Sequence, residues 1–257
     1  MILAIDVGNT NIVVGCVEGR ESLFVERLST DSGKTAMEYA VLFRSVLYLH
    51  DILPDRIEGS ILSSVVPLLG TVLTDAMEKI LPGKPHLSVG PGLKTGLPIA
   101  IDNPAQLGAD LVVAAVAALA EHMAPLIVID MGTATTLSAI DQKGVFRGVS
   151  IMPGLRVSMQ SLSSSAALLT DIGLSAPKRA IGTNTADSMR SGLMFGAAGM
   201  LDGLIDRMQE ELGTPCTVIA TGGLARFVIP LCRHEIVYDD ALLLKGLKIL
   251  YDKNINS

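Results

Sequence analysis

Two short polar turns carry the residues best suited to chemistry, and each directly follows an apolar, strand-like run. The first turn is DVGNTN, from Asp6 to Asn11, and the second is DMGTATT, which begins at Asp130, close to half the chain later. Their glycines lack a Cβ, so a phosphate oxygen can approach the backbone, and successive amide N–H groups can converge on an anion. An aspartate beside them can hold a hydrated cation that offsets phosphate charge. Both turns are therefore candidate phosphate sites.

An ordinary hairpin turn is the competing interpretation, since Asp-x-Gly-Asn sequences often connect two strands without binding anything. One copy alone would favour that interpretation. Residues 5–10 line up with residues 129–134 in the same strand context, and this recurrence favours phosphate binding instead.

A third glycine-containing loop, ATGGLA, follows an apolar strand late in the chain. Gly222 and Gly223 would let a nucleoside lie against bare backbone, although a plain strand-to-helix turn fits the same residues. The chain has neither a G-x-x-x-x-G-K-S/T sequence nor a G-x-G-x-x-G sequence, which argues against the common alternative nucleotide folds.

The hydrophobic pattern predicts the elements that position these turns, because alternating runs indicate strands and apolar residues at helical spacing indicate helices. In the first half, strands are expected at 1–6, 11–19, 22–29 and 58–66, with helices at 35–51, 68–81 and 106–122. In the second half, strands are expected within 124–141 and at 144–151 and 216–223, with helices near 153–169, 185–212 and 240–251.

Strands followed by helices predict an α/β fold. The recurrence of the opening pattern predicts a duplicated domain, with two similar lobes facing each other across a central cleft. We expect the N-terminal lobe at 1–115 and the C-terminal lobe at 116–257, with the closing helix packed back on the N-terminal lobe.

The composition disfavours several classes of function. The chain lacks the pattern of a nucleic-acid-binding protein, because its net charge is −6 and it has no run of Lys or Arg and no Trp. The three Cys and four His are scattered without zinc or dithiol spacing. The longest strongly apolar stretch, Leu111 to Ala120, is shorter than the ~20 residues of a membrane helix, and the start does not resemble a secretory signal. We expect a cytoplasmic protein that binds neither nucleic acid nor membrane.

Eight segments together identify a resemblance to a known family. In order they are DVGNTN, STDSGKTAMEY, NPAQLGAD, DMGTATT, IMPGLRVSM, IGTNTADSMRSG, ATGGLA and LLLKGLKILYDKN. With them the chain resembles the actin-like, acetate- and sugar-kinase superfamily, whose members have two ribonuclease H-like lobes. Within that superfamily it is similar to the type III pantothenate kinases over essentially its whole length.

The resemblance implies ATP-dependent phosphorylation of the primary hydroxyl of pantothenate to 4′-phosphopantothenate, the first step of coenzyme A biosynthesis. It also implies ATP with Mg²⁺, a monovalent cation (K⁺ or NH₄⁺) and a homodimer whose acceptor pocket is completed at the subunit interface. The implied phosphate- and nucleoside-binding residues are Asp6, Val7, Gly8, Asn9, Thr10, Asn11, Gly132, Thr133, Gly222 and Gly223. Asp130 is the implied ligand of the monovalent cation, and Asp6 is a candidate for the divalent cation through water.

The resemblance implies that Asp110 is the catalytic base and that the acceptor is bound by Gly108, Ala109, Asp110, Leu111 and Thr185. A carboxylate within reach of the acceptor hydroxyl suits proton removal during phosphoryl transfer. The residues alone also allow structural roles, since Asp110 lies near the expected start of a helix, where its charge favourably faces the helix dipole. Thr185 could equally be a helix N-cap.

Two positions near the implied acceptor site depart from the family pattern. Leu111 stands where the family usually has the Arg of GADR, and Ile101 stands where an aromatic residue is common. Gly148-Val149 likewise replaces a commoner Gly-Gly. Replacing Arg removes a charge and a bidentate donor for an anionic acceptor. The alternatives are therefore a kinase of the same fold for another small hydroxyl compound, or a catalytically silent nucleotide-binding regulator.

Overall fold

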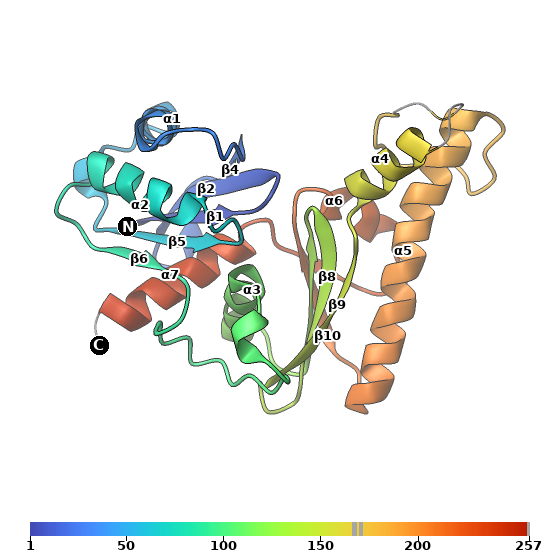
Figure 1. Ribbon diagram of the computed structural model, residues 1–257. Helices are drawn as coiled ribbons and strands as arrows, with labels where there is room; N and C mark the ends of the chain where they lie inside the picture. Colours follow the sequence, from blue (N-terminus) through green and yellow to red (C-terminus); the bar gives the residue numbers. More distant parts are fainter. Residues whose placement is uncertain (166–168, 170–171, 256–257) are drawn as a thin grey trace. The chain divides into compact units, whose positions relative to one another are not determined.

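The structure is a computed structural model that describes residues 1–165, 169 and 172–255. The fold is α/β, and the contacts divide the chain into two compact units, each built on one mixed sheet (Figure 1). Unit 1 contains Met1–Leu97, Asp102–Glu121 and Ala241–Ser257, and unit 2 contains Pro98–Ile101 and His122–Asp240. The expected α/β class is confirmed.

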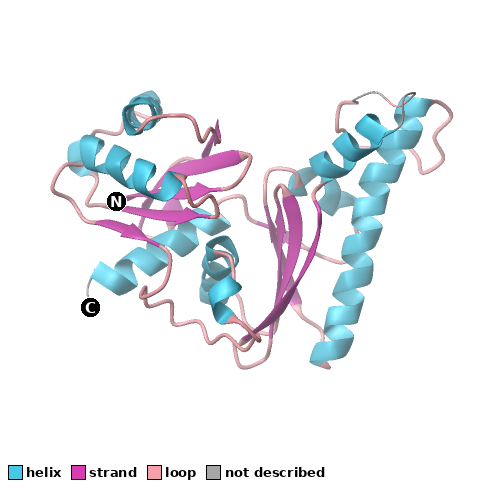
Figure 2. Ribbon diagram, in the orientation of Figure 1, coloured by secondary structure: helices cyan, strands magenta, loops and turns pink. Residues whose placement is uncertain are grey.

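Unit 1 is a six-stranded sheet with helices on both faces (Figure 2). The strand order is β3-β2-β1-β5-β6, and β4 also pairs with β2. The pairs β1–β2, β2–β3 and β2–β4 are antiparallel, and β1–β5 and β5–β6 are parallel. The elements are β1 (Ile2–Val7), β2 (Asn11–Glu18), β3 (Glu21–Ser22), β4 (Glu26–Ser29), α1 (Ala36–Leu49), a 3₁₀ turn (Pro54–Arg56), β5 (Ser60–Ser64), α2 (Leu69–Ile80), β6 (His86–Ser88), a 3₁₀ turn (Pro104–Gln106), α3 (Ala109–Glu121) and α7 (Leu242–Ile255).

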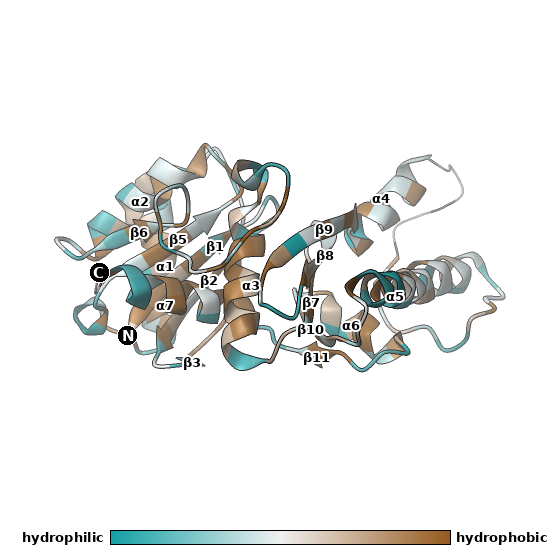
Figure 3. Cartoon of the chain, turned by 90° about the horizontal axis from the view of Figure 1, so that it is seen from below, coloured by the Kyte–Doolittle hydropathy of each residue, from teal (hydrophilic) through white to brown (hydrophobic). Residues whose placement is uncertain are grey.

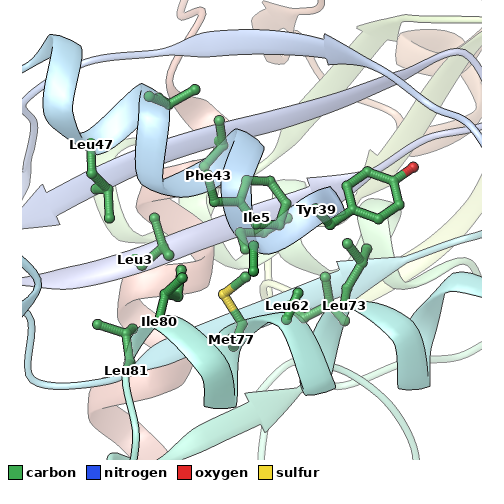
Figure 4. Packing of buried hydrophobic residues seen from close by; sticks show 14 of the residues in the cluster. Leu3, Ile5, Tyr39, Phe43, Leu47, Leu62, Leu73, Met77, Ile80 and Leu81 are labelled. Atoms are coloured by element: carbon green, nitrogen blue, oxygen red, sulfur yellow. The ribbon is translucent and has the colours of Figure 1, made fainter. Parts of the chain in front are cut away.

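One face of this sheet packs against α1 and α2. Side chains alternate between the two faces of a strand, and on β1 the odd-numbered residues Leu3, Ile5 and Val7 join this core. Figure 4 shows Tyr39 and Phe43 of α1 and Met77 of α2 packed around Ile5. Helix α1 begins with a capping box between Thr35 and Glu38, which satisfies backbone donors at its first turn.

The opposite face of the sheet is covered by α7, which contacts β1, β2 and β5, and by α3, which contacts β5 and α7. Helix α3 is apolar almost all round, as Figure 3 shows, and this pattern is typical of a helix that is buried on most of its surface. Gly246 lets α3 and α7 approach closely, since a Cβ there would collide with the carbonyl of Val113. Even-numbered residues of β1, Ile2, Ala4 and Asp6, point toward this face.

Unit 2 has a five-stranded sheet in the order β11-β10-β7-β8-β9. Strands β7, β10 and β11 are parallel, and β7–β8 and β8–β9 are antiparallel. The elements are β7 (Leu126–Met131), β8 (Ala134–Ile140), β9 (Phe146–Pro153), α4 (Leu155–Ser165), α5 (Thr185–Leu212), β10 (Thr217–Thr221), α6 (Ala225–Val228), a 3₁₀ turn (Ile229–Leu231) and β11 (Val237–Tyr238).

The core of unit 2 lies between one face of its sheet and the helices α4, α5 and α6. Ile127, Ile129 and Met131 of β7 pack here against Met194 and other apolar residues of α5. By alternation, Asp130 points to the opposite face of the sheet. Helix α5 is followed by its C-cap residue Gly213, whose φ of 72° is the left-handed conformation typical of a helix C-terminus.

Several expected elements differ in detail from the structure. The strand expected at 22–29 is interrupted at residues 23–25, where Phe24 turns inward and stacks on His50, with ring centroids 4.1 Å apart. The edge strands β6 and β11 were not expected, because two or three residues are too short to show alternation. Helix α4 is found within the helix expected near 153–169, whose residues 166–168 lie outside the described residues.

The expected division at residues 115 and 116 falls inside α3, and all of α3 belongs to unit 1 with α7. The assignment of ribonuclease H-like lobes at 1–115 and 116–257 stays a prediction.

Candidate active site

The first polar turn joins β1 to β2 as a hairpin. Inside the turn, the Gly8 amide donates to the Asn11 carbonyl at 3.0 Å. Thr30, just beyond β4, holds the turn from outside: its hydroxyl donates to the Gly8 carbonyl at 2.7 Å, and its amide donates to the Thr10 carbonyl at 3.0 Å. Asn9, Thr10 and Asn11 are exposed. The backbone is thus fixed while its polar side chains remain accessible.

The second polar turn joins β7 to β8 and is also a hairpin turn, one residue shorter, since Met131 pairs with Thr135 whereas Val7 pairs with Ile12. The Gly132 amide donates to the Ala134 carbonyl at 3.0 Å. Gly154 packs against this turn, since its amide donates to the Thr133 carbonyl at 3.0 Å and a Cβ on Gly154 would collide with the carbonyls of Gly132 and Thr133. Gly132 and Thr133 are exposed. Both turns expected from the sequence are therefore hairpin turns with accessible polar groups.

The glycine loop after β10 packs against the strand that carries the second turn. Gly222 has a φ of 99°, and a Cβ there would lie 2.6 Å from the Met131 carbonyl oxygen. Tyr238 covers the loop by donating its hydroxyl to the Gly222 carbonyl at 3.4 Å. Gly223 follows directly and α6 begins at Ala225. Within unit 2, the structure therefore brings Gly222 beside the end of β7.

Asp6 lies at the end of β1 with only 7% of its surface exposed. It pairs in register with Ser63 on the parallel strand β5, and Ser63 is fully buried. Paired residues in a parallel ladder point to the same face, here the face covered by α3 and α7. The carboxyl ends of parallel strands are where α/β sheets generally bind ligands.

Asp130 has a corresponding place in unit 2. It pairs with Thr136 on the antiparallel strand β8 and with Thr221 on the parallel strand β10. All three side chains point to the face of the sheet opposite α5. Each predicted cation-binding aspartate thus has a hydroxyl-bearing residue in register on a neighbouring strand.

Asp110 is the second residue of α3, within the first helical turn and half-buried. Its Oδ1 accepts a hydrogen bond from the Leu111 amide at 2.9 Å. Burial raises the pKa of the Asp110 carboxyl above its usual range, because it disfavours the charged form, and the amides of Leu111 and Asp110 itself offset this only in part. A carboxylate that served only the helix terminus would be stabilised in its charged form. The charge of Asp110 is therefore less favourable here than it would be at an exposed helix terminus.

Gly108 leaves the space into which the Asp110 carboxylate folds. A Cβ on Gly108 would lie 2.5 Å from Asp110 Oδ1, and the contact involves only the end of that side chain. We expect Gly108→Ala to displace the carboxylate without disrupting the fold and to lower kcat by roughly 10–100-fold. Gly70→Ala, in an open position of α2, is the control and should leave kcat unchanged. Unchanged kcat in both variants would show that the carboxylate needs no fixed position.

The remaining predicted acceptor residues differ in accessibility. Ala109 begins α3, and Leu111 is only 8% exposed, so its side chain belongs to the apolar packing of the helix. Thr185 is the exposed first residue of α5. Its neighbour Asn184 is the N-cap, with Oδ1 accepting from the Asp187 amide at 2.9 Å, so the alternative role of Thr185 as N-cap is wrong.

An apolar cavity of about 210 Å³ lies in unit 2 on the α5 side of the sheet. Met131 and Thr135 line it from the strands, whereas Asp130 points to the other face. The other lining residues are Met152, Pro153, Leu155, Ser158, Gly192, Leu193, Gly196, Ala197, Met200 and Leu201. This cavity is therefore separate from the predicted phosphate and cation residues.

In the part of the chain that the structure describes, no three His, Cys, Asp or Glu side chains gather where they could hold a metal ion. A cation here would be held by a single carboxylate, hydroxyl and backbone oxygens, and oxygens of water or phosphate. Mg²⁺ in nucleotide sites is commonly held in this way, through one or two carboxylates, substrate phosphates and several waters. The orphaned buried hydroxyl of Ser63 beside Asp6 is a polar atom that such a water shell would satisfy. The residues therefore fit a hydrated divalent cation.

The predicted site residues divide between the two units. Unit 1 contains the first turn and the residues from Gly108 to Leu111, and unit 2 contains Asp130, the second turn, Thr185 and the Gly222-Gly223 loop. Sequence reasoning gave no role to Thr30, Ser63 or Gly154. Thr30 lies in the quoted STDSGKT segment, but its contact with a turn twenty residues earlier depends on strand pairing that sequence alone does not reveal.

Comparison with known proteins identifies the family. The chain matches the family model described as type III pantothenate kinase over residues 2–207. It is 43% identical over 254 residues to a type III pantothenate kinase of Myxococcus xanthus, with 99% of each chain covered.

Two solved structures share the fold. One is a conserved putative Baf family transcriptional activator from Campylobacter jejuni, with a TM-score of 0.62 and 19% identity over 100% of both chains. The other is a putative 2-dehydro-3-deoxygalactonokinase from Sinorhizobium meliloti, with a TM-score of 0.58 and 13% identity over 98% of this chain and 99% of that one. At these identities the likeness concerns the fold. The sequence matches over nearly the whole chain show that it belongs to the type III pantothenate kinase family.

Proposed function

We propose that this enzyme transfers the γ-phosphoryl group of ATP to the primary hydroxyl of pantothenate, giving 4′-phosphopantothenate and ADP. Membership of the type III pantothenate kinase family carries this proposal. Membership of this family indicates a kinase that acts in coenzyme A biosynthesis, in agreement with the resemblance that the sequence motifs indicated.

Asp110 is the proposed base that accepts the proton of the acceptor hydroxyl as the phosphoryl group is transferred. Its raised pKa supports this role, because a carboxylate with increased basicity is a better proton acceptor near neutral pH. The hydrogen bond from the Leu111 amide to Oδ1 orients the carboxylate, and Gly108 gives it room. Most of the remaining catalysis would come from alignment and charge neutralisation.

The two polar turns are the proposed phosphate-binding elements, with Asp6 to Asn11 in one and Gly132 and Thr133 in the other. Their accessible side chains and fixed backbones support this assignment. The Gly222-Gly223 loop is proposed to lie near the nucleoside. Asp6 would hold Mg²⁺ through water, and Asp130 would hold K⁺ or NH₄⁺. Such cations neutralise the negative charge of the transferring phosphoryl group.

We further propose a cytoplasmic homodimer in which Thr185 contributes to the acceptor pocket. The exposed position of Thr185 at the start of α5 is compatible with contact to an acceptor or to a partner subunit. In the described part of the chain, no helix has both the length and the apolar character to cross a bilayer. Light scattering of the purified protein would measure the subunit number directly.

A kinase of the same fold with another acceptor is the second candidate, because Leu111 offers a buried apolar side chain where the family usually has Arg. A panel of small alcohols separates the two. The purified protein is supplied with ATP, MgCl₂ and KCl, and ADP release is measured with pantothenate and with hydroxyl compounds that lack its carboxylate. We expect the highest kcat/KM with pantothenate. A higher kcat/KM for an uncharged alcohol would assign the protein to the second candidate.

A further inference from the structure

Two buried hydroxyl groups have no hydrogen-bond partner. Among the described residues, the buried side-chain nitrogen and oxygen atoms without a hydrogen bond are Ser63 Oγ, Thr136 Oγ1 and His86 Nε2. The His86 nitrogen lies 3.2 Å from a carboxylate oxygen of Glu78, so a polar partner is close to it. For the Ser63 hydroxyl, and for that of the partly buried Thr136, no hydrogen bond is found within the described part of the chain.

Both hydroxyls occur beside the aspartates that the family resemblance implicates in cation binding. Ser63 is the register partner of Asp6 on β5, and Thr136 is the register partner of Asp130 on β8. In each pair the two side chains point to the same face of the sheet. The same relation therefore occurs once in each unit.

A buried polar group without a partner lowers the stability of the folded protein, because it has lost its hydrogen bonds to water. Alanine at 63 or valine at 136 would remove that cost, so neither hydroxyl is explained by packing. In native proteins such groups call for a specific explanation, and a ligand or ordered water that completes the hydrogen bonds is a common one.

We propose that Ser63 and Thr136 are further binding residues of the two cation sites. The Ser63 hydroxyl would hydrogen-bond to a water in the shell of the divalent cation at Asp6. The Thr136 hydroxyl oxygen would contact the monovalent cation at Asp130. Hydroxyl oxygens are hard donors of the kind that these cations accept. This inference rests on the proposed function for the presence of the two cations, but its test does not require an acceptor.

Ser60 provides a matched control in the same strand. It is as buried as Ser63, but its hydroxyl is hydrogen-bonded to His86 Nδ1 at 2.8 Å. A serine that serves only the fold should destabilise the protein when its hydroxyl is removed. Ser60→Ala is therefore expected to lower the melting temperature and to leave the Kd of Mg²⁺-ADP unchanged.

The first measurement is the thermal stability of the unliganded protein. We expect Ser63→Ala and Thr136→Val to melt at or above the wild-type temperature, in contrast to Ser60→Ala. A lower melting temperature for Ser63→Ala, with unchanged Mg²⁺-ADP binding, would overturn the proposal for Ser63. Ser63→Cys, which nearly keeps the volume of the side chain, is a second variant at this position. If neither Ser63→Ala nor Ser63→Cys folded, Ser63 would have a structural role instead.

The second measurement tests each of the two variants, Ser63→Ala and Thr136→Val, for its response to each of the two cations. Calorimetry with ADP at fixed KCl should show Mg²⁺-ADP binding weakened by roughly 3–10-fold in Ser63→Ala and unchanged in Thr136→Val. The rise in melting temperature when NaCl is replaced by KCl should be reduced in Thr136→Val and retained in Ser63→Ala, and Thr136→Ser should restore it.

If each variant bound both cations as the wild type does, the proposal would be overturned. A wild-type protein that binds Mg²⁺-ADP but does not phosphorylate pantothenate would contradict the proposed acceptor and leave this inference standing. The two failures are therefore distinguishable.

Discussion

Asp110→Asn is expected to lower kcat by roughly 10²–10⁴-fold, the usual contribution of a general base. The substitution keeps the size of the side chain and removes the group that accepts the proton. The backbone around it should stay in place, because the carboxylate makes its hydrogen bond to the adjacent Leu111 amide, which an Asn oxygen can also accept. Binding of Mg²⁺-ADP should persist in this variant, and steady-state kinetics with calorimetry would measure both properties.

The same variant should not lose stability at neutral pH. The folded-state pKa of Asp110 is raised by burial, so the folded protein binds its proton more tightly than the unfolded chain does. Stability therefore falls as pH rises from the ordinary pKa of an aspartate, ~3.9, through the raised pKa, and the loss persists above it. Asp110→Asn removes this cost, so its melting temperature at neutral pH should match or exceed the wild-type value, and this advantage should vanish in acid.

Ionisation of Asp110, which lowers the stability of the folded protein, should raise its activity. Proton acceptance requires the charged carboxylate, so kcat/KM of the wild type should fall as pH drops through the raised pKa. Asp102→Asn is the matched control, because Asp102 is exposed and lies eight residues before Asp110. The control should keep the wild-type profile. An Asp110→Asn enzyme with near-normal kcat would exclude this residue as the base.

Gly222→Ala is expected to be the most destabilising substitution in the predicted nucleotide site, by roughly 2–5 kcal/mol. Two costs add: a Cβ at a φ of 99° is strained, and it would lie 2.6 Å from the Met131 carbonyl oxygen. Met131 follows Asp130, so relief of the clash should move the end of β7 and the turn after it. We expect the Kd for Mg²⁺-ADP to rise together with the loss of stability.

Gly144→Ala separates the two costs. Gly144 also has a positive φ, 74°, but a Cβ there would meet nothing within 4 Å. It should therefore lose only the backbone contribution, roughly 1–2 kcal/mol, and bind Mg²⁺-ADP normally. Urea denaturation and calorimetry of both variants would test this. Equal losses in the two would mean that contact between Gly222 and β7 contributes nothing.

The parts of the fold that the sequence predicted are those with strong local patterns. The two hairpin turns after β1 and β7 were expected from Asp-x-Gly sequences between apolar strands, and α5 was expected with the bounds that the structure has. Local sequence was less informative for elements whose formation depends on contacts with residues far away in the chain. The edge strands β6 and β11 exist only through their neighbours, and Phe24 interrupts a predicted strand by packing inward.

The candidate site shows the same division between local and long-range information. The polar turns and Asp110 were recognisable from residue types and family resemblance, whereas residue types alone left Asp110 open between helix terminus and base. Ser63 could not be singled out, because SILSSVV reads as an ordinary buried strand until its register with Asp6 is known. A missing hydrogen bond is a property of the folded environment, and it cannot be read from spacing.

Product identification tests the central claim most directly. The purified protein is incubated with pantothenate, ATP, MgCl₂ and KCl, and phosphopantothenate is followed by mass spectrometry with Asp110→Asn in parallel. The account predicts product from the wild type and a rate lower by at least about a hundredfold from the variant. Wild-type protein that binds Mg²⁺-ADP but forms no phosphopantothenate would contradict it.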